Sequence, residues 1–267
     1  MPEKVVIGSA ELWHGDCMEV LPLLPRADAV ITDPPYSSGG MVRGDRMQAT
    51  NQKYSGWGGG AGTEASEHTF TGDTRDQRAF LTWCTLWLGQ LQRLANTGAH
   101  LLAFTDWRQL PTMTDAVQCG GWVWRGLLVW DKGIARPMKG RFRNHVEYMV
   151  WASNGPIDGD ANPVYLDCVF NRPPPPSAGR NHLTEKPEEL MADVLQVVRP
   201  GGLVVDPFMG SGTTGVAAVK YGRKFVGCEI DRRYFDTACR RIEAAQAQGS
   251  LLDDAGAPEQ VGLALEP

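Results

Sequence analysis

The positions of apolar residues along the chain predict short strands that alternate with amphipathic helices. Residues 27–31 are mostly apolar and partly β-branched, which is typical of a buried strand in a parallel sheet. Two longer apolar segments, Trp122–Trp130 and His145–Trp151, flank a polar stretch and predict a long hairpin. Further short strands are expected at Glu11–His14, His100–Phe104, Leu203–Val205 and Lys224–Cys228.

Apolar side chains spaced three and four residues apart predict the helices. The clearest helix is Gln77–Ala95, where Phe80, Trp83 and Leu91 fall on one face. Other helices are expected from about 107 to 118, from 186 to 198, after the glycines at 210–215, and from 231 to 248. Strands that alternate with helices indicate an α/β fold, with a mostly parallel sheet covered on both faces and the hairpin at its antiparallel edge.

Three stretches lack a periodic pattern. Residues 37–75 combine many glycines with basic and aromatic side chains, which predicts a mobile lid or substrate-clamping segment, with a disordered surface loop as the alternative. Residues 153–181 are rich in Gly, Asn and Pro and predict a linker or recognition loop. The tail, 249–267, is expected to be disordered. We therefore expect one domain over residues 1–248, with irregular inserts at 37–75 and 132–181.

The composition is that of a globular protein of 267 residues, with 42% hydrophobic and 21% charged residues. No run reaches the ~18 apolar residues of a membrane span, and the start lacks the apolar core of a signal peptide, so a cytoplasmic location is expected. The six cysteines include no Cys-x-x-Cys pair, so neither a zinc site nor a disulfide framework is indicated. A net charge of −5 argues against a general polyanion binder but allows a local basic patch.

The first chemical motif follows the strand at 27–31 and reads Asp33-Pro34-Pro35-Tyr36. Two prolines end the strand and leave a stiff loop at its carboxyl end, where open α/β sheets bind ligands. An exocyclic amine of a nucleobase is a poor nucleophile, because its lone pair is delocalised into the ring. Hydrogen bonds from its N–H groups to Asp33 and the Pro34 carbonyl would favour the nucleophilic form, and Tyr36 could stack on a flipped base. An ordinary turn is the alternative for this motif taken alone.

The second motif, Asp206-Pro207-Phe208-Met209-Gly210-Ser211-Gly212-Thr213, joins a strand to a helix. Together with Gly215, its glycines Gly210 and Gly212 match the dinucleotide fingerprint. Glu229 at the end of the next strand could accept both hydroxyls of a ribose. An NAD- or FAD-dependent oxidoreductase is therefore an alternative. Asp206 argues against it, because a carboxylate suits the ammonium of an amino-acid cofactor and repels a pyrophosphate. That alternative also leaves the motif at Asp33 without a role.

Three further features have competing interpretations. The hairpin tip carries basic side chains without an acidic one, and phosphate contact is favoured over a solvated charged face; these residues are Lys132, Arg136, Lys139, Arg141 and Arg143. Asp16 either caps a short helix or accepts a hydrogen bond from the adenine amine of a cofactor. His145 has no partner at metal-ligand spacing, so a structural histidine is expected.

The two motifs together resemble those of the DNA amino-methyltransferases. Asp33–Tyr36 comes first, 182–187 follows and Asp206–Gly212 comes last, which is the order of the β group of that family. The resemblance covers about residues 15–242 and implies a Rossmann-like S-adenosylmethionine-dependent methyltransferase fold. It implies a catalytic motif of Asp33, Pro34, Pro35 and Tyr36, and cofactor contacts by Asp16, Lys186, Asp206, Phe208, Gly210, Ser211, Gly212, Thr213 and Glu229, with His182, Thr184 and Lys186 near the cofactor methionine.

The resemblance further implies methyl transfer from S-adenosylmethionine to an amine of a base flipped out of double-stranded DNA. An acidic first residue such as Asp33 is usual among adenine-N6 enzymes, so adenine is expected and cytosine N4 is the alternative. No Pro-Cys pair is present, which argues against C5-cytosine methylation, because that reaction needs a thiolate nucleophile. No metal is required, and the β-group resemblance implies a possible homodimer.

Overall fold

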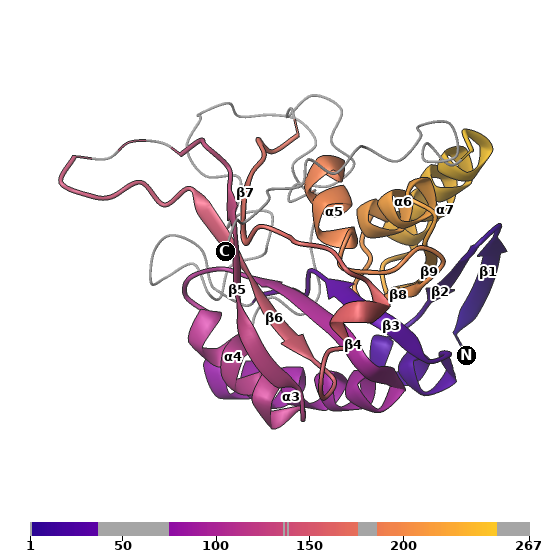
Figure 1. Cartoon of the computed structure of the whole chain (residues 1–267), viewed down its shortest axis with the longest axis horizontal. Coiled ribbons are helices and arrows are strands. Elements are labelled where there is room, and N and C mark those ends of the chain that lie inside the picture. The colour runs from indigo at the N-terminus through magenta and orange to yellow at the C-terminus, as the bar shows by residue number, and fades with distance from the viewer. Residues whose placement is uncertain (1, 37–74, 136, 138, 176–185, 250–267) are drawn as a thin grey trace, which may run out of the picture.

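The computed structural model describes residues 2–36, 75–135, 137, 139–175 and 186–249. These residues form a nine-stranded sheet between two groups of helices (Figure 1). The strands are β1 (Glu3–Ile7), β2 (Ala10–His14), β3 (Ala27–Thr32), β4 (Ala95–Thr105), β5 (Val123–Asp131), β6 (Val146–Ser153), β7 (Val169–Asn171), β8 (Leu203–Asp206) and β9 (Lys224–Glu229). Their order across the sheet is β1-β2-β9-β8-β3-β4-β6-β5-β7.

The sheet is mostly parallel, as the sequence predicts. β2, β9, β8, β3 and β4 run in one direction, whereas β1 is antiparallel to β2, and β6 is antiparallel to both β4 and β5. Since β3 pairs directly with β8, through Ala29 opposite Val204 and Val30 opposite Val205, the two chemical motifs leave adjacent strands. The carboxyl ends of the parallel strands and the amino end of β6 therefore share one edge of the sheet.

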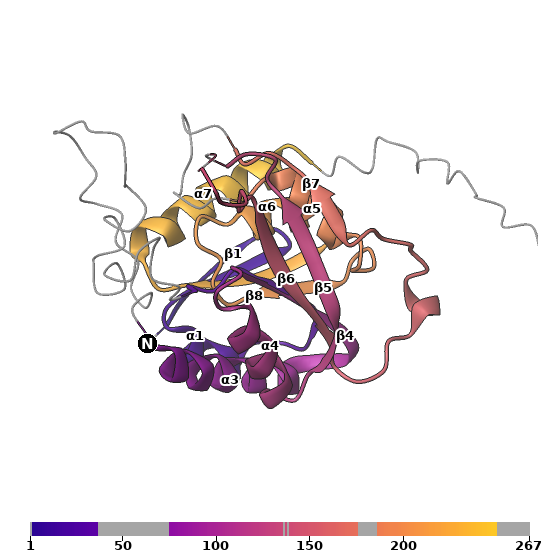
Figure 2. The ribbon, with the colours of Figure 1, turned by 90° about the vertical axis from the view of Figure 1, so that its left-hand side faces the viewer.

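Helices cover both faces of the sheet (Figure 2). They are α1 (Cys17–Val20), α3 (Gln77–Leu94), α4 (Leu110–Cys119), α5 (Glu188–Leu195), α6 (Thr213–Lys220) and α7 (Arg232–Ala247), with short 3-10 turns η1 (Leu21–Leu23) and η3 (Gly159–Ala161). The α3 and α4 helices pack on one face, and α5, α6 and α7 on the other. Among the helices within the described residues, none is long and apolar enough to cross a membrane.

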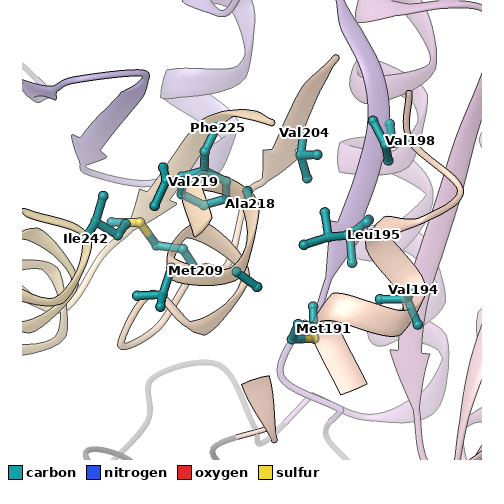
Figure 3. Close-up of a cluster of buried hydrophobic side chains, with 14 of the residues drawn as sticks. Met191, Val194, Leu195, Val198, Val204, Met209, Ala218, Val219, Phe225 and Ile242 are labelled. Carbon is teal, nitrogen blue, oxygen red and sulfur yellow. The ribbon is translucent and has the colours of Figure 1, made fainter. Parts of the chain in front are cut away.

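Each face has its own hydrophobic core. On the α3 side, Phe80 and Trp87 are fully buried against the sheet. On the opposite side, Leu195, Phe225 and Ile242 are fully buried between the sheet and its helices (Figure 3). Burying one such side chain stabilises the fold by about 1.5–3 kcal/mol. The two cores hold β3 and β8 rigidly in the centre of the sheet, which fixes the loops that follow them.

The structure corrects several predicted boundaries. β7 lies within 153–181, where little regular structure is expected, and it pairs with β5, so β7 rather than the hairpin forms that edge of the sheet. With three residues and an exposed Val169, β7 gives almost no apolar signal. The α4 helix begins at Leu110 rather than 107, because the Asp106 side chain accepts hydrogen bonds from the backbone N–H groups of Arg108 and Gln109. β1 and the first five residues of β4, 95–99, are likewise missed, since polar residues interrupt them.

Candidate active site

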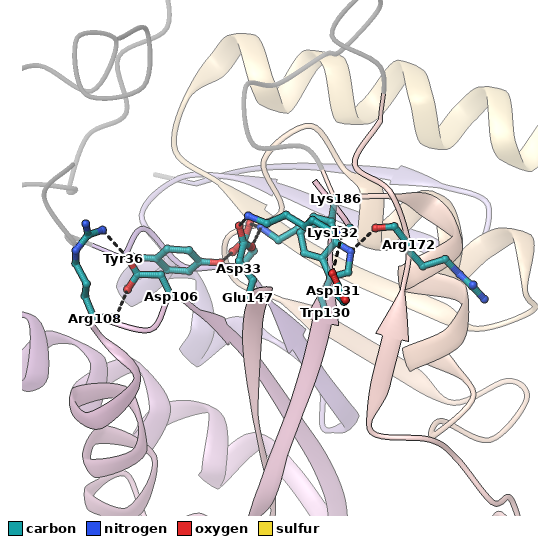
Figure 4. Close-up of polar contacts among 11 residues, drawn as sticks. Asp33, Tyr36, Asp106, Arg108, Trp130, Asp131, Lys132, Glu147, Arg172 and Lys186 are labelled. Carbon is teal, nitrogen blue, oxygen red and sulfur yellow. Dashed lines mark hydrogen bonds and ion pairs between the residues drawn. The ribbon is translucent and has the colours of Figure 1, made fainter. Parts of the chain in front are cut away.

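The predicted catalytic motif lies at the carboxyl end of β3, and its two polar side chains contact each other. The Tyr36 hydroxyl donates a hydrogen bond to Asp33 Oδ1 (Figure 4). Burial, together with the carboxylates of Asp33 and Glu147, raises the pKa of Tyr36 well above its usual value, so the phenol stays protonated. Tyr36 was expected to stack on a flipped base, and that role stays a prediction. In the structure its hydroxyl fixes the orientation of the Asp33 carboxylate.

Lys186 contacts the Asp33 carboxylate as well. Its Nζ donates to Asp33 Oδ2, although the two residues are 153 positions apart in the chain. The ammonium is buried and lies 5.0 Å from the ring centre of Phe104, 5.8 Å from that of Tyr36 and 5.9 Å from that of Trp130. Burial lowers the pKa of Lys186, but the neighbouring carboxylates raise it more, so the net shift is upward and the ammonium remains charged. The family resemblance implies that Lys186 lies near the cofactor methionine, and that role stays a prediction. In the structure Lys186 contacts Asp33.

Glu147 is a residue of the site that the sequence analysis did not single out. It lies near the amino end of β6, where its Oε1 accepts a hydrogen bond of 2.9 Å from Lys132 Nζ. Its Oε2 lies 3.6 Å from Lys186 Nζ. Burial raises the pKa of Glu147, but the two lysines lower it more, and the net shift is downward. The sequence does contain one indication of this role: Glu147 is the only carboxylate in an otherwise mostly apolar strand that starts at Val146.

Asp206 joins the two motifs through side-chain hydrogen bonds. Its Oδ1 accepts from the Thr32 hydroxyl at 2.7 Å and from the Phe208 N–H at 3.1 Å, and its Oδ2 accepts from the Thr214 hydroxyl at 2.8 Å. The side chain is 2% exposed, and this burial raises its pKa to about 6. Contact with a cofactor ammonium stays a prediction. In the structure, Asp206 links the end of β3 to β8 and α6.

The glycine-rich turn between β8 and α6 is shaped by backbone that favours glycine. Gly210 and Gly212 have φ angles of +52° and +84°. The Gly210 N–H donates to Glu229 Oε2 at 3.0 Å, which holds the turn against the end of β9. Arg241 of α7 donates to the Ser211 carbonyl at 2.8 Å and to the Thr213 hydroxyl at 3.3 Å. The roles of Ser211 and Thr213 toward a cofactor stay predictions, and both residues bind the α7 arginine here.

Three other predicted cofactor residues, Asp16, Phe208 and Glu229, lie within the described residues. Phe208 packs against Trp83 and Trp87 of α3, with ring centres 5.3 and 5.2 Å apart. Asp16 caps α1, because its Oδ1 accepts from the Met18 N–H at 2.9 Å. The Asp16 and Glu229 carboxylates follow neighbouring strands, since β2 pairs with β9 and the Gly15 N–H donates to the Glu229 carbonyl. His182 and Thr184 lie outside the described residues.

The donor and acceptor chemistry of this region fits S-adenosylmethionine. Two carboxylates, Asp16 and Glu229, can accept hydrogen bonds from the hydroxyl and amino groups of an adenosine and would disfavour a pyrophosphate. Within the part of the chain that the structure describes, a Cβ added to Gly210 would meet nothing within 4 Å, which leaves space for a cofactor to approach the turn. Burial raises the pKa of Glu229 to about 7, although the N–H groups of Gly210 and Asp231 donate to its two oxygens. Among the described residues, no cluster of His, Cys, Asp or Glu side chains could hold a metal ion.

Cofactor affinity should fall below pH 7 if the Glu229 carboxylate accepts the ribose hydroxyls. In the free protein its pKa is about 7, so lowering the pH protonates the group that the hydroxyls require. Linkage then predicts a dissociation constant about tenfold higher at pH 6 than at pH 8, with net proton release on binding at pH 6. Calorimetry in two buffers of different ionisation enthalpy measures both quantities. Glu229→Gln should remove the pH dependence, and a wild-type affinity that is constant from pH 6 to 8 would contradict this role of Glu229.

The basic residues of the hairpin divide into two groups. Lys132, at its base, is paired with Glu147. Lys139, Arg141 and Arg143, near its tip, are exposed on a segment that projects from the sheet (Figure 1). Arg136 lies outside the described residues, as do residues 37–74 of the predicted lid and the tail from 250. His145 Nδ1 lies 2.7 Å from Asp131 Oδ1, a contact that closes the base of the hairpin, as expected for a structural histidine.

Comparison with known proteins identifies the family. The DNA methylase model for N6 and N4 methyltransferases matches residues 27–240. YubD, a putative methylase of Escherichia coli strain K12, is 26% identical over 253 residues, which cover 92% of this chain and 97% of the relative. The M1.HpyAVI–SAM complex has a TM-score of 0.63 at 24% identity, over 87% of this chain and 98% of that one. The cytosine-N4-specific PvuII DNA methyltransferase has a TM-score of 0.67 at 15% identity, over 88% of this chain and 87% of that one.

The matched range contains the catalytic loop, Lys186, the glycine-rich turn and Glu229. A single family therefore accounts for both motifs, and the oxidoreductase alternative is wrong because it explained only the glycines. The Rossmann-like fold predicted from the sequence is confirmed. This chain belongs to the DNA methylase family, whose members use S-adenosylmethionine to methylate an exocyclic amine of DNA at N6 or N4.

Proposed function

We propose that the protein methylates the N6 amine of adenine in double-stranded DNA after the base has flipped out of the duplex. The observation that carries the choice of base is the carboxylate at Asp33, the first position of the catalytic motif, where an acidic residue is the usual form among adenine enzymes. Cytosine N4 is the alternative, because its amine offers the same two N–H groups to Asp33 and the Pro34 carbonyl.

The catalytic loop would act by orienting and polarising the target amine. One N–H of the amine donates to Asp33 and the other to the Pro34 carbonyl, so the nitrogen becomes pyramidal and its lone pair points toward the donor methyl. When bound, S-adenosylmethionine supplies a methyl group already activated by its sulfonium. Positioning therefore accounts for most of the rate gain. As the N–C bond forms, the bond between the methyl group and the sulfonium sulfur would break, and its electron pair would stay on the sulfur as a neutral thioether. The nitrogen then releases one proton to water, so Asp33 does not need to be a strong base.

The deciding experiment identifies the modified base directly. The protein is incubated with tritiated S-adenosylmethionine and unmethylated duplex DNA, and the digested nucleosides are analysed by mass spectrometry. We expect N6-methyldeoxyadenosine. N4-methyldeoxycytidine would keep the mechanism and overturn the choice of base. If the protein binds the cofactor but no labelled nucleoside appears, the assignment of duplex DNA as the substrate is overturned. The homodimer implied by the β-group resemblance stays a prediction, which sedimentation would test.

The hairpin tip is the proposed contact with DNA phosphates. Arg141 and Arg143 are exposed on both sides of Phe142, which is itself fully exposed. Each cation that neutralises a phosphate contributes about 0.9 to the slope of log affinity against log salt concentration. Replacing both arginines with alanine should therefore weaken DNA binding and reduce that slope by about 2. Fluorescence anisotropy at salt concentrations from about 50 to 200 mM measures this slope, because phosphate contacts dominate the salt dependence in roughly that range.

A matched control for the hairpin is the replacement of Arg232 and Arg240 by alanine. These arginines lie on α7, where Arg232 pairs with Glu3 and Asp236, and the change removes the same charge. The control variant should keep the wild-type salt slope. An unchanged slope in the hairpin variant, or an equal reduction in both variants, would contradict a phosphate role for Arg141 and Arg143.

A further inference from the structure

The Asp33 carboxylate, which the proposed function requires as an acceptor for the target amine, is already paired on both oxygens. Oδ1 accepts from the Tyr36 hydroxyl, and Oδ2 accepts from the Lys186 ammonium (Figure 4). An amine that enters the site must share or displace one of these donors. Tyr36 belongs to the same short loop as Asp33 and moves with it. Lys186 comes from a distant segment and has a flexible four-carbon stem, so it is the donor that can leave.

An alternative acceptor for Lys186 lies next to it. Glu147 Oε2 is buried, and no group of the described residues donates a hydrogen bond to it. It lies 3.6 Å from Lys186 Nζ. The other oxygen of this carboxylate, Oε1, is held by Lys132 at 2.9 Å, so the side chain is fixed in place. A buried carboxylate oxygen without a donor is unfavourable, and a shift of Nζ by less than about 1 Å would satisfy it.

The surroundings allow this shift without exposing a charge. The Lys186 ammonium lies within 6 Å of the ring centres of Tyr36, Phe104 and Trp130, at 5.8, 5.0 and 5.9 Å, and aromatic faces attract a cation at such distances. Carboxylates and ammoniums alternate along Asp33, Lys186, Glu147 and Lys132. Moving one ammonium from the first carboxylate to the second leaves the formal charge of the group unchanged.

We propose that Glu147 is a positioning residue of the methyl transfer, which takes the Lys186 ammonium from Asp33 when the target amine enters. Asp33 Oδ2 then becomes the acceptor for the amine, while Tyr36 keeps the carboxylate oriented through Oδ1. Lys186 thus protects the catalytic carboxylate in the free enzyme and withdraws in the complex with the flipped base. The inference rests on the proposed function, since it concerns the step in which the amine reaches Asp33.

The first test replaces Glu147 with glutamine, which keeps the shape and removes the charge that attracts Lys186. The single-turnover rate at saturating DNA and cofactor should fall about a hundredfold, which is the scale expected when a reacting group is misplaced by about 1 Å. The dissociation constant for S-adenosylmethionine and the melting temperature should stay near wild type. Glu11→Gln is the matched control, because Glu11 is also borne on a strand and accepts from a lysine, Lys4, at 3.1 Å. That variant should react at the wild-type rate.

The second test distinguishes positioning from a structural role by a double-mutant cycle. If Glu147 acts only through Lys186, Glu147→Gln should have no further effect in a Lys186→Met background. Independent, multiplicative losses would overturn the inference, as would a wild-type rate for Glu147→Gln or a loss of its fold. Lys186→Gln provides the same background if Lys186→Met does not fold. Wild-type protein that transfers no methyl group would instead count against the proposed function, so the two failures are distinguishable.

Discussion

Asp33→Ala should lower the rate of methyl transfer by about 10²–10³-fold, the typical cost of removing one preorganised polar group that acts on the transition state. The variant loses the acceptor that polarises the target amine. Its fold should survive, because Lys186 can pair with Glu147, whose Oε2 lies 3.6 Å from Nζ. Single-turnover rates with labelled cofactor measure the loss, and calorimetry measures cofactor affinity, which should change by less than about threefold.

Asp33→Asn sharpens this prediction. The amide keeps the size of the side chain but offers an NH₂ group where the carboxylate offered a second acceptor. The amide oxygen can still accept one N–H of the target amine, so this variant should lose less activity than the alanine variant. The difference between the two rates separates the need for an acceptor from the need for a negative charge. An Asp33→Ala variant that loses cofactor binding as severely as activity would contradict a catalytic role. Asp193→Asn, on α5, is a control that removes a carboxylate paired with Arg172 at 2.9 Å, away from Asp33.

The centre of the fold could be predicted because its signals are local. β3 and β8 are apolar runs that end at proline-containing loops, and parallel strands bring their carboxyl ends to the same edge. The adjacency of Asp33 and the glycine-rich turn followed from that rule together with the family resemblance. A hydrogen bond of 2.7 Å between Thr32 and Asp206 directly connects the ends of these two strands. No local pattern could indicate that bond, since it depends on the register of β3 with β8.

The partners of Asp33 could not be predicted for a related reason. Lys186 precedes α5, and nothing in its neighbourhood in the sequence favours Asp33 over a cofactor carboxylate as its anion. Glu147 reaches the same place only because β6 runs antiparallel to β4, which brings its amino end to the edge formed by the carboxyl ends of the other strands. The rule that ligands bind at the carboxyl ends of parallel strands does not point to a residue at the amino end of an antiparallel strand. The short edge strand β7 was missed because three half-exposed residues carry too little apolar pattern.

Two different constraints act on the glycine-rich turn, and substitutions can separate them. A Cβ at Gly212 would lie 2.9 Å from Ala238 Cβ and 3.1 Å from its Cα, so α7 prevents any side chain there. A Cβ at Gly210 would meet no atom of the described residues within 4 Å. Both glycines have positive φ, as does Gly222 at the far end of α6, where a Cβ also meets nothing within 4 Å. Gly222→Ala therefore reports the backbone cost alone.

Gly212→Ala should destabilise the protein more than Gly222→Ala does. Left-handed backbone costs about 1–2 kcal/mol for alanine in either variant, and the contact with Ala238 adds about 1–3 kcal/mol. For a domain of this size, each kcal/mol lowers the melting temperature by about 2–4 °C. Differential scanning calorimetry of the two variants measures the difference. Equal melting temperatures would show that α7 moves aside without cost.

Gly210→Ala should have the opposite profile: a stability close to that of Gly222→Ala, with a loss of at least about tenfold in affinity for S-adenosylmethionine. No atom of the described residues lies within 4 Å of a Cβ at Gly210, so we expect the added methyl group to collide with the bound cofactor. Each 1.4 kcal/mol of such a collision costs about a factor of ten in affinity. Calorimetric titration of both variants at pH 8, where Glu229 is ionised, gives the comparison. If Gly210→Ala binds the cofactor as tightly as Gly222→Ala, the turn does not approach the cofactor, and the site must lie farther toward Asp16.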